Sequence, residues 1–220
     1  MIIGITGFIG SGKDTVANMF VERGCVHDSF AAPLKDVCSS IFGWPREMLE
    51  GDTVESRDFR EMPDMFWTKK LGVPNFTPRL ALQLLGTEVL RNHFDQDIWL
   101  NSLEYRMRKM SESSPCVVVS DARFRNELDL IKNMGGVVIW VQRGELPEWY
   151  ETASQAHSNV VCRKIMTTKY KDVHESEWNW AGYNVDYIIN NNGTLEDLEK
   201  QVETIRDWNT GQFKEHLKLV

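Results

Sequence analysis

The sequence has no excess of basic charge. Its 25 Lys and Arg residues are outnumbered by 32 Asp and Glu residues, which gives a formal net charge of -7 at pH 7. Nonspecific binding to a nucleic-acid polymer needs many cations on one face, so this balance argues against such a partner. A small anionic ligand needs only a local basic pocket, which the overall charge does not exclude.

Cysteine is scarce, and long apolar runs are missing. Widely spaced cysteines without a Cys-x-x-Cys pair indicate neither a zinc site nor a disulfide framework, so we expect a reducing, cytoplasmic setting (the host cytoplasm if the protein is viral). No basic segment followed by an apolar one opens the chain, and no apolar run could span a bilayer, so we expect a soluble protein without a membrane partner. The cysteines are Cys25, Cys38, Cys116 and Cys162.

Internal repeats and low-complexity segments are also missing. A chain of 220 residues that is 42% hydrophobic can bury a full core, and its length predicts one domain, residues 1–220. Two stretches interrupt the periodic pattern, and we expect both to be irregular: a substrate-side insert at 44–78 and a lid-like insert at 145–182. The second gathers four basic residues, which would suit either an ordinary solvated surface or, in a phosphoryl-transfer enzyme, a lid: Arg163, Lys164, Lys169 and Lys171.

One strong motif lies at the start of the chain. The apolar residues 1–5 lead into Gly7-Phe8-Ile9-Gly10-Ser11-Gly12-Lys13 and then into an amphipathic segment. Strand, phosphate-cradling loop and helix follow one another in this order in nucleotide-binding P-loops. The glycines permit positive φ, and the helix offers unpaired N–H groups to an anion, so Lys13 would reach the outer phosphates of a nucleoside triphosphate. The alternative is a glycine-rich turn without a ligand.

The motif departs from its usual form after the lysine. The usual pattern ends in Gly-Lys-Ser/Thr, with the hydroxyl on Mg²⁺, whereas here Lys13 is followed by Asp14 and then by Thr15. Either Asp14 contacts the metal shell and Thr15 a phosphate, or the metal is held mainly by the nucleotide and a carboxylate elsewhere.

A second charged segment follows the β-branched run Pro115-Cys116-Val117-Val118-Val119-Ser120, which is typical of a strand buried on both faces of a parallel sheet. Ligands of open α/β sheets bind at the carboxyl ends of the strands, so Asp121 and Arg123 should lie near the P-loop. Asp121 could orient Mg²⁺ or its waters, and Arg123 could clamp a phosphoryl group. The alternative role for Asp121 is a helix cap.

Two helices offer further candidates. One opens at Ala31 and presents Lys35 near its start as a phosphate or base contact, or else as an ordinary surface lysine. The other begins at Arg79, and Arg79 and Gln83 share one of its faces because they are four residues apart. An arginine and an amide side by side suit a ligand edge, but also an ordinary polar face. The expected apolar faces comprise Val37, Ile41 and Phe42 in the first helix and Leu80, Leu84, Leu85, Val89 and Leu90 in the second.

Strands and helices alternate along the chain. This alternation predicts an α/β fold in which a parallel, five-stranded sheet of P-loop kinase type is covered by helices on both faces. The last helix is expected from Leu195 to about Trp208, and Thr194 and Asp197 have the spacing of a capping pair at its start. The Asn-Lys-x-Asp motif expected of GTPases is missing. The size, the Asp-x-Arg turn and the two inserts favour a small-molecule kinase.

Several short motifs, in the same order, resemble the bacteriophage-type deoxynucleoside monophosphate kinases, a branch of the P-loop nucleotide kinases. The P-loop is the only specific one, and the likeness depends on their joint order. They are Gly10 to Thr15; Ala32-Pro33-Leu34-Lys35-Asp36; Arg79, Leu82 to Glu88, Asn92, Phe94-Asp95 and Trp99; Asp121-Ala122-Arg123 with Glu127; Met134-Gly135, Val138-Ile139 and Arg143; His174 to Glu177; and Asn191 to Glu196.

The resemblance implies transfer of the γ-phosphoryl group of ATP, with Mg²⁺, to a deoxynucleoside 5′-monophosphate. It implies that Lys13, Asp121 and Arg123 are catalytic, that Asp14 and Thr15 serve the metal, and that a lid arginine such as Arg163 assists. ATP would be held by Gly10, Ser11, Gly12, Lys13, Asp14 and Thr15. The acceptor site would comprise Lys35, Arg79, Gln83, Thr87, Trp99, Asp121, Arg123 and Glu127.

Three other readings remain open at this point. The chain could be a dephospho-coenzyme A kinase-like enzyme, an adenylate kinase relative, or a regulatory protein that binds ATP without turnover. Base preference cannot be deduced, because one amide and one aromatic residue suit several bases. The family likeness also suggests a possible homodimer.

Overall fold

The computed structural model describes residues 1–110 and 116–207. The chain divides into two compact units, which we call the sheet unit (residues 1–28 and 110–220, in its described part) and the helical unit (residues 29–109). Pro115 and Trp208, at which we expected a strand to begin and a helix to end, lie outside the described residues.

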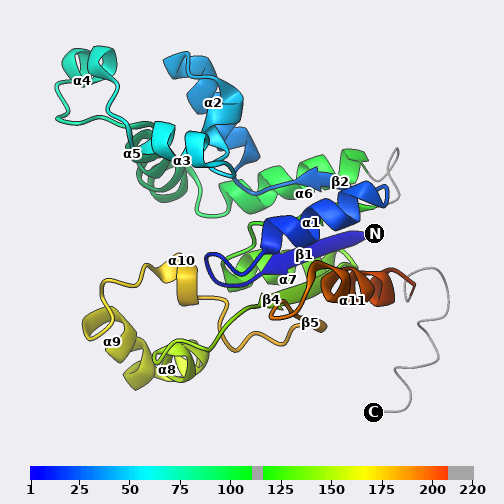
Figure 1. The fold of residues 1–220 in the computed structure, drawn as a ribbon. Helices are drawn as coiled ribbons and strands as arrows, with labels where there is room; N and C mark the ends of the chain where they lie inside the picture. The colour runs from blue at the N-terminus through cyan, green and yellow to red at the C-terminus, as the bar shows by residue number, and fades with distance from the viewer. Residues whose placement is uncertain (111–115, 208–220) are drawn as a thin grey trace. The chain divides into compact units, whose positions relative to one another are not determined.

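Figure 1 labels most of the elements of both units. The sheet unit contains β1 (Ile2–Thr6), α1 (Lys13–Glu22), β2 (Val26–Asp28), β3 (Val117–Val119), α7 (Arg125–Asn133), β4 (Val137–Gln142), α8 (Tyr150–Gln155), α9 (Val160–Thr168), α10 (Glu175–Trp178), β5 (Tyr187–Asn190) and α11 (Leu195–Asp207). The helical unit contains α2 (Ala32–Phe42), η1 (Arg46–Leu49), α3 (Val54–Glu61), α4 (Met65–Leu71), α5 (Pro78–Gln83), η2 (Leu84–Phe94) and α6 (Ile98–Met110).

The five strands form one parallel sheet in the order β2-β3-β1-β4-β5. β1 lies at its centre, where Ile3 pairs with Val118 of β3 and with Val137 of β4. Strands buried on both faces read as largely apolar runs, as the three central strands β3, β1 and β4 do. The predicted five-stranded parallel sheet is therefore confirmed.

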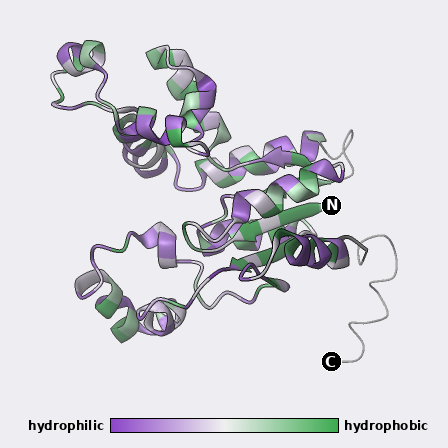
Figure 2. Ribbon diagram, viewed as in Figure 1, coloured by the Kyte–Doolittle hydropathy of each residue, from purple (hydrophilic) through white to green (hydrophobic). Residues whose placement is uncertain are grey.

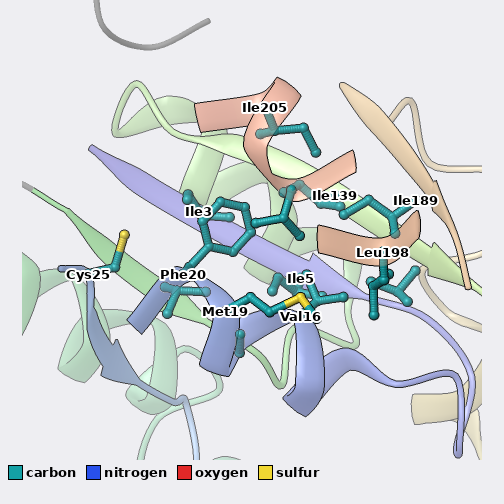
Figure 3. Packing of buried hydrophobic residues seen from close by; sticks show 14 of the residues in the cluster. Ile3, Ile5, Val16, Met19, Phe20, Cys25, Ile139, Ile189, Leu198 and Ile205 are labelled. Carbon is teal, nitrogen blue, oxygen red and sulfur yellow. The ribbon is translucent and has the colours of Figure 1, made fainter. Parts of the chain in front are cut away.

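Helices cover both faces of this sheet. Successive residues of a strand point to opposite faces. On one face, Ile3 and Ile5 pack in a buried cluster with residues of α1 and α11, which Figure 3 shows from close by. On the other face, a Cβ added at Gly4 would lie 2.4 Å from the Ile131 side chain of α7, so glycine makes room for that helix. Figure 2 shows β1 as hydrophobic and α11 as largely hydrophilic outside its buried stripe.

A disulfide joins the starts of β2 and β3. Cys25 and Cys116 directly precede Val26 and Val117, which pair in the sheet, and their Cα atoms are 4.5 Å apart. Our expectation of no disulfide was wrong, because 91 residues of sequence separation conceal the adjacency of two parallel strands. The cysteine pattern therefore no longer supports a reducing compartment. Of the described helices, none is both long and apolar enough to cross a membrane.

The two stretches that we expected to be irregular contain helices. Residues 44–78 include η1, α3 and α4, and residues 145–182 include α8, α9 and α10. Short capping signals start these helices: Thr53, Asp64 and Asn159 each accept a hydrogen bond from a backbone N–H in the first turn. The second stretch has its own buried cluster, made of Ala153, Ala156, Met166, Trp178 and Ala181.

The predicted helix from Arg79 is α-helical only as far as Gln83. From Leu84 it continues as a π-helix, in which the backbone bonds span five residues, as in the bond from Asp95 N to Leu90 O at 2.9 Å. Side chains four apart then no longer stack, so the predicted apolar face is wrong there, and Leu84 and Val89 are exposed.

The predicted apolar face of α2 is also wrong in part. Val37 and Ile41 are exposed, whereas Leu34 and Cys38 are the buried residues of the helix. The face of α2 that packs is therefore rotated by one residue from the predicted face: it contains Cys38 rather than Val37.

Candidate active site

The P-loop runs from the end of β1 to the start of α1, as predicted. Gly7, Gly10 and Gly12 have φ values of 146°, 76° and 94°, which residues other than glycine rarely adopt. Gly12 has a second constraint, because a Cβ there would lie 2.3 Å from Asn191 Nδ2. Asn191, just after β5, donates this amide to the carbonyl of Ser11 at 2.8 Å, so the turn after β5 supports the loop.

Lys13 is the first residue of α1, and its side chain folds back over the loop. Its Nζ donates to the carbonyls of Gly7 at 2.9 Å and Phe8 at 2.7 Å. Burial lowers the pKa of Lys13 to about 8, and the nearby charge of Arg123 adds to this effect, while Asp14 and Glu177 oppose it. The lysine thus has a partly buried ammonium group that an anion would stabilise in its charged form.

Asp14 and Thr15 occupy the first turn of α1, and both are exposed. Their carboxylate and hydroxyl oxygens are hard donors of the kind that Mg²⁺ prefers, and Mg²⁺ is commonly held by one or two carboxylates together with substrate phosphates. These two residues therefore fit a phosphate-bound metal ion. The described residues contain no cluster of three or more His, Cys, Asp or Glu side chains that could hold a metal on its own.

The Asp121 turn begins at the carboxyl end of β3. Val119 of β3 pairs with Gly4 of β1, and because the strands are parallel, Asp121 and Arg123 follow β3 at the edge from which the P-loop leaves β1. The effect of Arg123 on Lys13 agrees with that placement. The residue that caps α7 is Phe124, so the alternative of Asp121 as the helix cap is wrong.

Glu127 stabilises this turn through hydrogen bonds to its backbone. Its side chain is buried, and its Oε2 accepts hydrogen bonds from the backbone N–H groups of Arg123 at 2.8 Å and Phe124 at 3.0 Å. The carboxylate therefore fixes the path of the chain that carries Arg123. Glu127 therefore acts on the position of Arg123, and its predicted contact with the acceptor stays a prediction.

We predict that Glu127→Ala lowers the free energy of unfolding by about 2 kcal/mol, because it leaves two backbone donors unsatisfied. Urea denaturation followed by circular dichroism measures this change. Glu196→Ala is the control, because Glu196 forms only an exposed ion pair with Lys200, and its loss should cost less than about 0.5 kcal/mol. Equal stability losses in the two variants would contradict the supporting role of Glu127.

Two residues without a role predicted from the sequence, Glu177 and Asn179, also contact the segment that carries Arg123. Arg123 Nη1 donates to Glu177 Oε1 in α10, and the backbone N–H of Arg125 donates to Asn179 Oδ1 at 3.0 Å. The sequence offered His174 to Glu177 only as a motif without a role, and no local spacing signals a contact 54 residues away.

An aromatic cluster joins the P-loop to the stretch 145–182. The ring of Phe8 lies 4.9 Å from Trp180, 5.5 Å from Trp149 and 6.0 Å from Tyr150, between ring centroids. Trp140 of β4 stacks on Tyr150 at 5.6 Å. Phe8, a variable position of the loop motif, therefore fastens this stretch to the loop.

The candidate residues of the helical unit form their own contacts. Lys35 Nζ donates to Glu50 Oε2 at 2.5 Å, and Arg46 pairs with the same carboxylate and with Asp36. The two cations hold the pKa of Glu50 below its usual value against the opposing effect of burial. Lys35 is thus part of an ion-pair network on the first turn of α2 rather than a lone surface lysine.

Four further candidates lie on α5, η2 and α6. Arg79 forms an ion pair with Glu61, and the side chains of Gln83 and Thr87 are exposed. Trp99 is buried, and its Nε1 donates to a backbone carbonyl of η2, that of Gly86, at 3.0 Å. This bond fixes the indole against the π-helix.

The fold and the loop together define a class of protein. A parallel sheet with a central first strand, a loop whose three glycines have positive φ, and a helix that begins at the loop lysine are the features of a P-loop nucleotide-binding protein of the kinase type.

Comparison with known proteins narrows this class. The chain is 32% identical over 213 residues to a protein of Acanthamoeba polyphaga mimivirus named "Putative deoxynucleotide monophosphate kinase", with 92% of this chain and 94% of that protein covered. A family model described as deoxynucleotide monophosphate kinase matches residues 47–149. The chain belongs to the deoxynucleotide monophosphate kinase family.

One more distant curated relative agrees with this assignment. The deoxynucleoside-5′-monophosphate kinase of Escherichia phage T5 is 26% identical over 183 residues, which cover 60% of this chain and 72% of that protein. Among solved structures, a dephospho-CoA kinase from Campylobacter jejuni is 16% identical and has a TM-score of 0.44, with 94% of this chain and 95% of that chain covered.

Proposed function

We propose that the protein transfers the γ-phosphoryl group of ATP to a deoxynucleoside 5′-monophosphate, giving ADP and a deoxynucleoside diphosphate. One observation supports the phosphoryl-transfer part: the Lys13 ammonium lies over the P-loop and donates to the carbonyls of Gly7 and Phe8, and Arg123 is near enough for its positive charge to lower the pKa of Lys13. The choice of a deoxynucleoside monophosphate as acceptor follows from membership of the family.

Positioning and charge neutralisation carry such reactions, because the acceptor phosphate is already an anion and the transferred group bears negative charge throughout. We propose that Gly10, Ser11 and Gly12 bind the phosphates of ATP with their backbone, while Lys13 and Arg123 neutralise the transferred group. Glu127 keeps Arg123 in place through the turn. We propose that the acceptor is bound by Lys35, Arg79, Gln83, Thr87, Trp99 and Asp121.

We further propose that Mg²⁺ accompanies ATP, held by its phosphates together with Asp14 and Thr15. Bound there, the ion would offset phosphate charge and orient the leaving group. Asp121 would orient its waters from the carboxyl end of β3. The stretch 145–182 would serve as a lid, and Arg163 of α9, which lies 3.9 Å from Glu175, would be its phosphate-facing cation.

The lowered pKa of Lys13 makes ATP affinity pH-dependent. Below pH 8 the ammonium is charged and binds phosphate; above the pKa of about 8 the free protein loses this proton, and ATP must restore it. The dissociation constant for ATP should therefore rise by up to about tenfold per pH unit above pH 8. Titration calorimetry between pH 7 and pH 10 measures it. Lys13→Arg, which stays charged, should remove the dependence, and an equally steep rise in that variant would contradict it.

A coupled assay of ADP release tests the proposed activity. The purified protein is given ATP, Mg²⁺ and one of a panel of deoxy- and ribonucleoside monophosphates, with dephospho-coenzyme A as a further acceptor. We expect release above the ATP-only rate with at least one deoxynucleoside monophosphate. If no acceptor raises ADP release above the ATP-only rate, a regulatory ATP-binding protein is favoured. Release with dephospho-coenzyme A alone would favour a dephospho-coenzyme A kinase. Light scattering of the same preparation tests the homodimer suggested by the family likeness.

A further inference from the structure

The ion pair between Arg123 and Glu177 has no part in the reaction described above, although it lies at the candidate active site. Glu177 Oε1 accepts a hydrogen bond from Arg123 Nη1, and the Glu177 side chain is only 18% exposed. Glu177 belongs to α10, a short helix capped by His174, whose Nδ1 accepts a hydrogen bond from Ser176 N at 3.2 Å. A largely buried carboxylate is thus directed at a cation that we assign to phosphate.

Glu177 also acts on the loop lysine. The negative charge of Glu177 favours the ammonium form of Lys13, whereas the positive charge of Arg123 disfavours it. Two cations and one carboxylate therefore lie within electrostatic range of one another beside the P-loop. The Glu177 carboxylate repels a triphosphate, because both are negatively charged. Phosphate binding by the P-loop therefore does not explain its presence.

The chain around Glu177 is fastened on two sides. On one side, Arg125 donates its backbone N–H to Asn179 Oδ1 at 3.0 Å and its Nε to the carbonyl of Asn179 at 3.2 Å. On the other side, Trp180 packs against Phe8 of the loop, with ring centroids 4.9 Å apart. These contacts hold α10 beside both the Asp121 turn and the P-loop, so the position of Glu177 is built into the fold.

We propose that Glu177 is the resident counter-ion of the phosphate-binding cations: it holds Arg123 in the nucleotide-free protein, and the terminal phosphate of ATP displaces it from Arg123. This inference rests on the proposed ATP site. Because Glu177 competes with the phosphate, the protein binds ATP less tightly than its cations alone would allow. The pairing keeps Arg123 beside the loop before nucleotide arrives, which lowers the cost of ordering it later.

Binding of ATP to Glu177→Gln, with Mg²⁺ and without an acceptor, tests this inference by calorimetry. The substitution keeps the shape and removes the charge, so we expect the dissociation constant to fall about threefold to fivefold, the upper part of the range expected of one partly exposed ion pair. Glu151→Gln is the matched control, because Glu151 is an exposed carboxylate of α8 in the same stretch. It removes the same charge and should change the constant less than twofold.

A double-mutant cycle assigns the effect to the ion pair. In an Arg123→Gln background, Glu177→Gln should tighten ATP binding less than twofold, because no guanidinium remains to be released. Unchanged or weaker binding by Glu177→Gln in the wild-type background, or undiminished tightening without Arg123, would overturn the inference. A merely structural role for Glu177 would weaken ATP binding.

A second variant, and ATP binding and turnover by the wild-type protein, separate a failure of this inference from a failure of the proposed function. If Glu177→Gln does not fold, Glu177→Asp replaces it: the shorter side chain reaches Arg123 less well and should tighten binding in the same direction by a smaller factor, so wild-type or weaker binding would overturn the inference. A wild-type protein that binds ATP and turns over an acceptor, with no tightening in the variants, would refute this inference alone. A wild-type protein that does not bind ATP would refute the proposed function as well.

Discussion

Lys13→Ala is expected to lower kcat/KM for phosphoryl transfer by about 10³-fold or more, while the protein stays folded. Lys13 is the first residue of α1, and we propose that its ammonium binds the outer phosphates of ATP. Removal of one preorganised charge or donor from a transition state commonly costs about 10²-fold to 10³-fold, and an arginine on a transferred phosphoryl group costs up to about 10⁵-fold.

The fold should tolerate this change. Among the described residues, Lys13 donates to the carbonyls of Gly7 and Phe8. Burial disfavours its positive charge, so alanine removes two hydrogen bonds but also the desolvation cost of that charge. Steady-state kinetics with thermal unfolding checks both halves of the prediction. Lys200→Ala, which removes an exposed lysine paired with Glu196, should leave the kinetics unchanged. Near-normal turnover by Lys13→Ala would refute the role of the loop lysine.

Arg123→Ala should lower kcat by about 10²-fold to 10³-fold, with a smaller change in the KM for ATP. Arg123 follows β3 at the P-loop edge of the sheet, and Glu127 and Glu177 hold its backbone and its side chain. Because ATP must displace Glu177 from Arg123, the arginine contributes little net free energy to ATP binding, so its loss should affect kcat more than the KM for ATP.

The matched control for Arg123 is Arg108→Ala on α6. Arg108 is an exposed arginine that pairs with Glu104 one turn away, and its removal should leave kcat within about twofold of the wild-type value. If Arg123→Ala raised the KM for ATP with kcat unchanged, Arg123 would be a ground-state binding residue and its proposed catalytic role would be wrong.

The parts of the molecule that the sequence predicted are those with strong local signals. The sheet followed from apolar strands such as β3, and the P-loop followed from three glycines and Lys13 at fixed spacing. A capping pair was predicted at the start of α11, where Thr194 Oγ1 accepts from Asp197 N at 3.2 Å and Asp197 returns the bond. Each of these signals lies within a few residues, so the pattern alone determines the local structure.

The parts that the sequence did not predict depend on contacts between distant residues. Glu177 meets Arg123 across 54 residues, and the Cys25–Cys116 bond spans 91. The change to a π-helix at Leu84 leaves the apolar pattern intact and alters only which residues stack. In the stretch 145–182, buried aromatic and small side chains stabilise helices too short to show a clear period.

Transfer of labelled phosphate to the acceptor is the most direct test of the central claim. The protein is incubated with Mg²⁺, ATP labelled in its γ-phosphate and a deoxynucleoside 5′-monophosphate, and the nucleotides are separated. The account predicts that the label appears in the β-position of a deoxynucleoside diphosphate at the rate at which ADP forms. Label that remains in ATP, or that appears only as inorganic phosphate with every acceptor of the panel, would contradict it.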